Sequence, residues 1–196
     1  MDKEAKLEEH QKYIKKNFFA IGSSHARSLS KLVYQNRITC IPGASLSGFY
    51  KNIKEVIKTQ IKKYSKLIII IGGNDLIDQQ LQQIRTQLVQ QFLADIQDLL
   101  NIRKNLQKTD DNLIFFLLPP RYPQNIELQK QIRKVNKKIV KVFVQARQNN
   151  IKVSWIDLHK LGWEQKNFRP DQTHFSREGE EELTKKAILD TLLMER

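Results

Sequence analysis

Ser24 lies near one end of the chain, and Asp171 and His174 lie near the other end, separated by only two residues. A serine hydroxyl is a weak nucleophile until a neighbouring base removes its proton, and histidine is the usual base. A carboxylate beside the histidine fixes the imidazole tautomer and stabilises the charged ring. These residue types therefore predict nucleophilic catalysis. Taken alone, Ser24 is more typical of a helix N-cap, and the Asp171 to His174 tetrad is common as a surface turn.

A second candidate element is Gly72-Gly73-Asn74-Asp75, which follows the apolar run over residues 67–71. A glycine-rich exit from a buried strand lets the backbone approach a ligand, and the Asn74 amide could hold an oxyanion. The alternative is a turn in which Asn74 and Asp75 cap the next helix. Gly43 could add a backbone N–H to the same oxyanion hole, or it could be an ordinary turn glycine.

The segments that must position these residues alternate between strand and helix patterns. Short segments rich in β-branched and aromatic residues predict strands over 17–22, 37–41, 67–71, 112–118 and 152–156. Apolar helical periods predict helices over 24–34, 51–64, 79–106, 125–149 and 177–193. The glutamine-rich start of the third helix keeps an apolar period through Leu81, Ile84 and Leu88, so we expect a surface helix there.

The strand segments are mostly apolar on successive residues, which is typical of parallel strands covered on both faces. Strict alternation with helices implies right-handed crossovers and a three-layer α/β/α fold. Ligands of such sheets bind at the carboxyl ends of the strands. Ser24, Gly43, Asn74 and the Asp171–His174 pair all fall in loops that leave those ends, so we expect them at one edge of one sheet.

Length and composition favour a single domain over residues 1–196, with a charged N-terminal helix over 1–16. The net charge of +13 favours encounters with polyanions such as nucleic acid or an acidic membrane surface. Cys40 is the only cysteine, which excludes an internal disulfide and a cysteine-based metal site. The charged N-terminus does not resemble a signal peptide, and the apolar runs are far shorter than the ~20 residues of a spanning helix. We therefore expect an intracellular, cytoplasmic protein that binds no metal.

Four ordered blocks resemble those of the SGNH (GDSL-type) hydrolases: Gly22 to Leu29, Gly43, Gly72 to Asp75, and Asp171 to His174. The resemblance spans almost the whole chain. It implies a flavodoxin-like, five-stranded parallel sheet of order 2-1-3-4-5, and it implies no cofactor.

The roles of the family carry over to the matching positions. Ser24 matches the nucleophile, and His174 and Asp171 complete the triad. The backbone N–H groups of Ser24 and Gly43, with the Asn74 side chain, match the oxyanion hole. Ser23 departs from the family, which usually has Asp there. The departure removes a carboxylate that helps to organise the nucleophile turn, so lowered or lost turnover is an open alternative.

A looser likeness is to the esterase domains in first-reading-frame proteins of some LINE-type retrotransposons. It rests on the Ser-His-x-Arg form of the first block, on Ile41 to Ser45, and on Leu118-Pro119-Pro120-Arg121. Three residues beside the predicted site, His25, Arg27 and Arg121, are candidate substrate contacts. For His25 and Arg27 the alternative is a first helical turn that faces solvent.

Two rows of lysines fall at helical spacing: Lys51, Lys54, Lys58 and Lys62, and Lys130, Lys134, Lys137 and Lys141. Such rows are usually solvated faces, but they could bind a polyanion.

The sequence thus predicts a serine esterase that cleaves a small-molecule or lipid carboxylic ester through an acyl-Ser24 intermediate. The alternative is a weakly active or inactive SGNH scaffold that acts as a basic module for RNA or an anionic membrane.

Overall fold

Five parallel strands form the central sheet of the computed structural model, which describes residues 3–46, 51–78, 80–106, 112–120, 125–161, 163–171 and 173–194. The strands are β1 (Phe19–Gly22), β2 (Ile38–Cys40), β5 (Lys66–Ile70), β8 (Asn112–Phe116) and β9 (Val153–Ile156). They lie in the order β2-β1-β5-β8-β9. Counted along the chain within this sheet alone, that order is 2-1-3-4-5. The predicted α/β fold class is confirmed.

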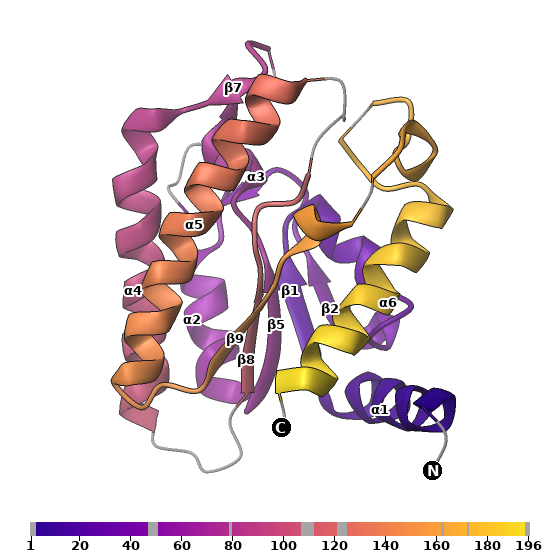
Figure 1. Cartoon of the computed structure of the whole chain (residues 1–196). Coiled ribbons are helices and arrows are strands. Elements are labelled where there is room, and N and C mark those ends of the chain that lie inside the picture. Colours follow the sequence, from indigo (N-terminus) through magenta and orange to yellow (C-terminus); the bar gives the residue numbers. More distant parts are fainter. Residues whose placement is uncertain are drawn as a thin grey trace.

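Helices cover both faces of the sheet and make the three layers visible in Figure 1. The helices of one face are α2 (Lys54–Lys63), α4 (Val89–Leu106) and α5 (Ile126–Gln148). The elements of the other face are α1 (Lys3–Asn17), the 3-10 helix η1 (Ser24–Leu29) and α6 (Arg177–Met194). Ile69 of β5 packs into the first layer, whereas Ile68 and Ile70 pack into the second. Burial on both faces explains why the strands are apolar at successive positions.

The charged N-terminal segment is the helix α1 and packs against the domain. Ile14 and Phe18 are both buried in the core that α1 shares with α6. The His10 ring also lies 3.0 Å from the Thr191 hydroxyl of α6. Within the described ranges, no helix combines the length and the apolar character needed to cross a membrane.

The predicted helix over 79–106 is wrong in its first third, because α4 begins only at Val89. An antiparallel pair, β6 (Ile77–Asp78) and β7 (Gln83–Ile84), precedes α4, followed by the 3-10 turn η3 (Thr86–Leu88). Gln82 has a positive φ of 50°, which a helix cannot contain, and Leu81 is 66% exposed. The apolar period in this stretch therefore does not mark a helix. Gln79 lies outside the described residues.

The predicted helix over 24–34 is also shorter than expected, because η1 ends at Leu29. The Leu29 carbonyl accepts from the N–H groups of both Leu32 and Val33, so the chain turns back toward β2. The remaining helices begin and end within a few residues of their predicted limits. Two further short strands, β3 (Ala44–Ser45) and β4 (Lys51–Asn52), and the short helix α3 (Gly73–Leu76) lie near the carboxyl edge of the sheet.

The residue that ends β1 must be glycine. A Cβ on Gly22 would lie 2.0 Å from the Ile70 carbonyl oxygen of the neighbouring strand β5. The Ile70 carbonyl also accepts the N–H of Ser23, at 3.2 Å. This close approach holds the start of the nucleophile turn against the end of β5.

Candidate active site

Ser24, His174 and Asp171 form a continuous hydrogen-bonded relay. The Ser24 Oγ lies 2.8 Å from His174 Nε2, and His174 Nδ1 lies 2.7 Å from Asp171 Oδ2. A carboxylate can only accept, so Nδ1 carries the proton of the neutral ring. Nε2 therefore presents a lone pair to the Ser24 hydroxyl. This is the tautomer in which a histidine can take a proton from a serine.

Asp171 is held by its own loop. Its Oδ1 accepts the backbone N–H groups of Thr173 and His174, each at 2.9 Å. The loop is closed by a bridge between Phe168 and Phe175, and by the Arg169 N–H, which donates to the His174 carbonyl at 2.8 Å. Burial acts to raise the pKa of Asp171. Hydrogen bonds from the N–H and ring of His174 and from the Thr173 N–H outweigh it and lower the pKa from 3.8 to about 2. The carboxylate is therefore ionised at neutral pH.

His25 packs directly behind the base. Its ring stacks on the His174 ring with centroids 5.3 Å apart and planes at 25°, and the Phe175 ring meets it edge-on at 5.7 Å. His25 Nε2 lies 2.9 Å from the Thr173 carbonyl, which can only accept, so Nε2 is the donor. The side chain is 4% exposed. This buried position argues against the expected substrate contact and also against a solvent-facing turn.

The structure describes only one of the other two candidate substrate contacts. Arg27, in the same turn as His25, is exposed. Arg121 lies outside the described residues.

The loops that carry Gly43 and Asn74 are tied together. The Asn74 amide donates to the Ala44 carbonyl at 3.0 Å, and the buried Asp75 carboxylate accepts the Leu46 N–H at 2.6 Å. Gly43 has a φ of +75°, a conformation that favours glycine. The expected alternative in which Asp75 caps the next helix is wrong, because Gly72 is the N-cap of α3 and Asp75 lies inside it. The sequence offered no sign that Asp75 joins two loops.

Ser23 is the N-cap of η1, so Ser24 is the first residue of that helix and is not its cap. The Ser23 side chain is buried and makes no capping hydrogen bond. The Ser23 backbone carbonyl accepts the Ala26 N–H at 2.9 Å and lies 3.4 Å from the Cys40 thiol of β2. The position at which the SGNH pattern has a carboxylate is therefore a buried serine in this chain.

We expect the Asp171 loop to lose stability only in acid. The lowered pKa means that the ionised carboxylate stabilises the fold above pH 3.8, and that this contribution is lost as the pH falls toward about 2. Asp171→Asn has no such proton to gain. Between these two pH values the melting temperature of the wild type should fall more steeply than that of the variant. Parallel curves in thermal unfolding experiments would contradict the assignment.

Comparison with known proteins identifies the family of the chain. The family model described as GDSL-like lipase/acylhydrolase matches residues 12–187. A comparison with curated protein sequences gives no match. Among solved structures, a family 3 carbohydrate esterase from Clostridium thermocellum is similar with a TM-score of 0.65 and 15% identity, over 91% of this chain and 96% of that one.

Two other similar structures come from different bacteria. Axe2, an acetylxylan esterase from Geobacillus stearothermophilus, has a TM-score of 0.62 and 15% identity, over 89% of this chain and 93% of that one. A lipase/acylhydrolase from Enterococcus faecalis has a TM-score of 0.54 and 18% identity, over 90% and 95% of the two chains. At these identities the structures support the fold, whereas the family model covers most of the sequence. The chain therefore belongs to the GDSL-like lipase/acylhydrolase family.

Proposed function

We propose that this protein is a serine esterase that hydrolyses a carboxylic ester through an acyl-enzyme on Ser24. The observation that carries the proposal is the relay of 2.8 Å and 2.7 Å hydrogen bonds from Ser24 through His174 to Asp171. Family membership supports the same class of reaction. The proposal assigns each of the three residues a separate chemical role.

The first half of the reaction transfers the acyl group to the enzyme. The Ser24 Oγ attacks the ester carbonyl carbon while its proton passes to His174 Nε2. The protonated ring is stabilised by the Asp171 carboxylate, which stays ionised because its pKa is about 2. When the tetrahedral intermediate collapses, the bond to the leaving alcohol breaks and His174 gives that oxygen its proton.

The second half repeats these steps with water. His174 takes a proton from a water molecule, the oxygen attacks the acyl carbon, and the Ser24 Oγ leaves and regains its proton from His174. The products are a carboxylic acid and the free enzyme. No atom or electron from outside the substrate and water is required.

The oxyanion of each intermediate needs donors, and we assign the backbone N–H groups of Ser24 and Gly43 and the Asn74 amide. Ser24 is the first residue of η1, so its N–H has no acceptor within that helix. Asn74 uses one of its two N–H bonds on the Ala44 carbonyl, next to Gly43. The second N–H can therefore serve the oxyanion while the first keeps the Asn74 and Gly43 loops in register.

Acetyl esters are the first substrates to test. Two of the similar structures are described as a carbohydrate esterase and an acetylxylan esterase. A short acyl group also needs the least space beside Ser24. Hydrolysis of p-nitrophenyl acetate compared with longer-chain esters then measures the acyl preference.

The alternative is a weakly active or inactive SGNH scaffold that binds RNA or an anionic membrane, and it rests on Ser23 and on the net charge of +13. An inactive scaffold would not require a base aligned with Ser24, so the assembled relay favours hydrolysis. The same assay decides between the two, because an inactive scaffold gives no Ser24-dependent rate.

Ser24→Ala should lower kcat for p-nitrophenyl acetate by ~10⁴-fold or more, since loss of the nucleophile leaves only binding and oxyanion stabilisation. A fluorophosphonate probe should modify Ser24 in the wild type, as mapped by peptide mass spectrometry. Ser30→Ala, an exposed serine just after η1, is the matched control and should react like the wild type. Equal rates for wild type and Ser24→Ala, with no labelling of Ser24, would refute the proposal.

His25 should act as a positioning residue for the base. His25→Ala removes both the ring stacked on His174 and the donor to the Thr173 carbonyl, and we expect kcat to fall ~10-fold or more with little change in KM. His25→Gln retains an N–H donor and should recover part of the loss. A wild-type kcat in His25→Ala, or equal losses in both variants that follow their melting temperatures, would mean that His25 has only a packing role.

A further inference from the structure

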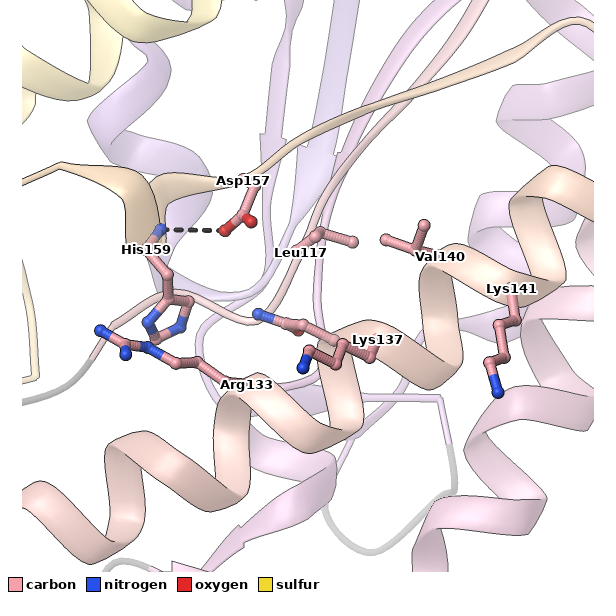
Figure 2. Close-up of a pocket in the computed structure, with 8 residues that line it drawn as sticks. Leu117, Arg133, Lys137, Val140, Lys141, Asp157 and His159 are labelled. Carbon is pink, nitrogen blue, oxygen red and sulfur yellow. Dashed lines mark hydrogen bonds between the residues drawn. The ribbon is translucent and has the colours of Figure 1, made fainter.

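A recess lies between α5 and the carboxyl ends of β8 and β9 (Figure 2). It has a volume of about 560 Å³. Its lining combines apolar, cationic and polar side chains: Leu117, Arg133, Asn136, Lys137, Val140, Lys141, Asp157 and His159. This lining includes none of Ser24, Asp171 and His174. The recess, here called the α5 groove, is therefore a separate candidate site.

One wall of the α5 groove is a row of cations. Arg133, Lys137 and Lys141 follow one another at four-residue intervals on α5, which places them about 6 Å apart along the helix axis. All three are exposed, and Figure 2 shows that the Arg133 side chain extends toward His159, whereas the Lys141 side chain points away from Leu117 and Asp157. Cations in a line are suited to a ligand whose negative charges are also arranged in a line.

The opposite wall adds little negative charge. Asp157 is the single acid of the lining, and its Oδ1 accepts the His159 N–H at 2.9 Å. Burial lowers the pKa of His159. The Asp157 carboxylate opposes this effect, the nearby Arg133 adds to it, and the hydrogen bond to the Leu118 carbonyl opposes it least, so the net shift is downward. The His159 ring is therefore neutral at physiological pH. The groove keeps a clear excess of positive charge.

The floor of the groove is apolar and fixed. Leu117 is buried, and Figure 2 shows Val140 of α5 facing it. The Asn136 side chain is committed to the backbone of Leu118, accepting its N–H at 2.9 Å and donating to its carbonyl at 3.1 Å. A flat, partly apolar ring can rest on such a floor while charged groups meet the cations of the wall.

The lysine row predicted on the other helix differs from this one. Lys54 of α2 bonds to Asp95 at 2.6 Å and to Asp98 at 2.8 Å, and Lys58 bonds to Glu55 at 2.5 Å. These acids neutralise the middle of that row. Of the α5 row predicted from the sequence, Lys137 and Lys141 line the groove together with Arg133, whereas Lys130 and Lys134 are not part of the lining. The cations of the groove have a stronger claim to bind an anion than the row on α2.

We propose that the α5 groove binds the phosphate backbone of a single-stranded nucleic acid. The regular line of cations fits phosphates that repeat along a strand, and a positively charged groove is the usual device for following such a backbone. A membrane surface fits less well. The recess lies between α5 on one side and the ends of β8 and β9 on the other, and a flat bilayer cannot enter it. The lining has no Phe, Tyr or Trp on which bases stack, so binding is salt-sensitive and tolerant of base sequence.

The experiment compares two triple variants of the whole chain on the same helix. The groove variant is Arg133→Gln, Lys137→Gln, Lys141→Gln. The control is Lys130→Gln, Lys134→Gln, Lys138→Gln, which removes three exposed cations outside the groove lining. Both lower the net charge from +13 to +10. Fluorescence anisotropy with a labelled, short single-stranded RNA measures affinity at several salt concentrations, and circular dichroism checks the fold of each variant.

The groove variant should bind ~10-fold more weakly or worse, and its plot of log affinity against log salt should be shallower by about 2, for three lost phosphate contacts on a single strand. The control and Ser24→Ala should bind like the wild type. Equal weakening in both triple variants, or no binding by the wild type at low salt, would overturn the proposal. The proposal would also be overturned if phosphatidylserine vesicles, or inorganic polyphosphate at equal phosphate concentration, bound more tightly than the RNA.

Discussion

The hydrogen bond between Ser24 and His174 joins two residues that are 150 positions apart, and the site depends on it. Neither partner could be held there by local structure alone. Ser24 is placed by the close contact of Gly22 with β5, and His174 by the bonds from its own loop to Asp171. Ser24 is thus held by the sheet and His174 by a carboxylate, and the two side chains lie within hydrogen-bonding distance. The geometry tolerates little movement on either side.

The parallel sheet brings Ser24 and His174 together. Strands that run in one direction bring all their carboxyl ends to one edge, so loops from distant parts of the chain become neighbours. Side chains then join those loops in pairs. Asn74 and Asp75 bond to the backbone of Ala44 and Leu46, and His25 bonds to the backbone of Thr173. The candidate oxyanion donors and the base are therefore held by contacts between loops as well as by their own strands.

The class of fold could be predicted, because apolar strand segments that alternate with amphipathic helices leave few alternatives. The order of the five strands was implied by the resemblance to the SGNH hydrolases. The candidate triad could be named because a serine, a histidine and an aspartate suited to nucleophilic catalysis all fall in loops at the same predicted edge of the sheet. The contacts that hold it could not, since His25 and Asp75 owe their roles to partners remote in sequence. The helix predicted to begin at residue 79 was wrong because its apolar period began at Leu81. Its spacing suits a helix, but Gln82 adopts a positive φ and the chain forms a hairpin.

The central claim is that Ser24, His174 and Asp171 act as one unit. Kinetics of Ser24→Ala, His174→Ala and the double variant on one ester test it most directly. For a relay, the double variant should be no slower than the slower single variant, because loss of either residue already stops the proton transfer. Independent contributions would instead multiply, so that the double variant loses the product of the two single losses. That result would contradict the account.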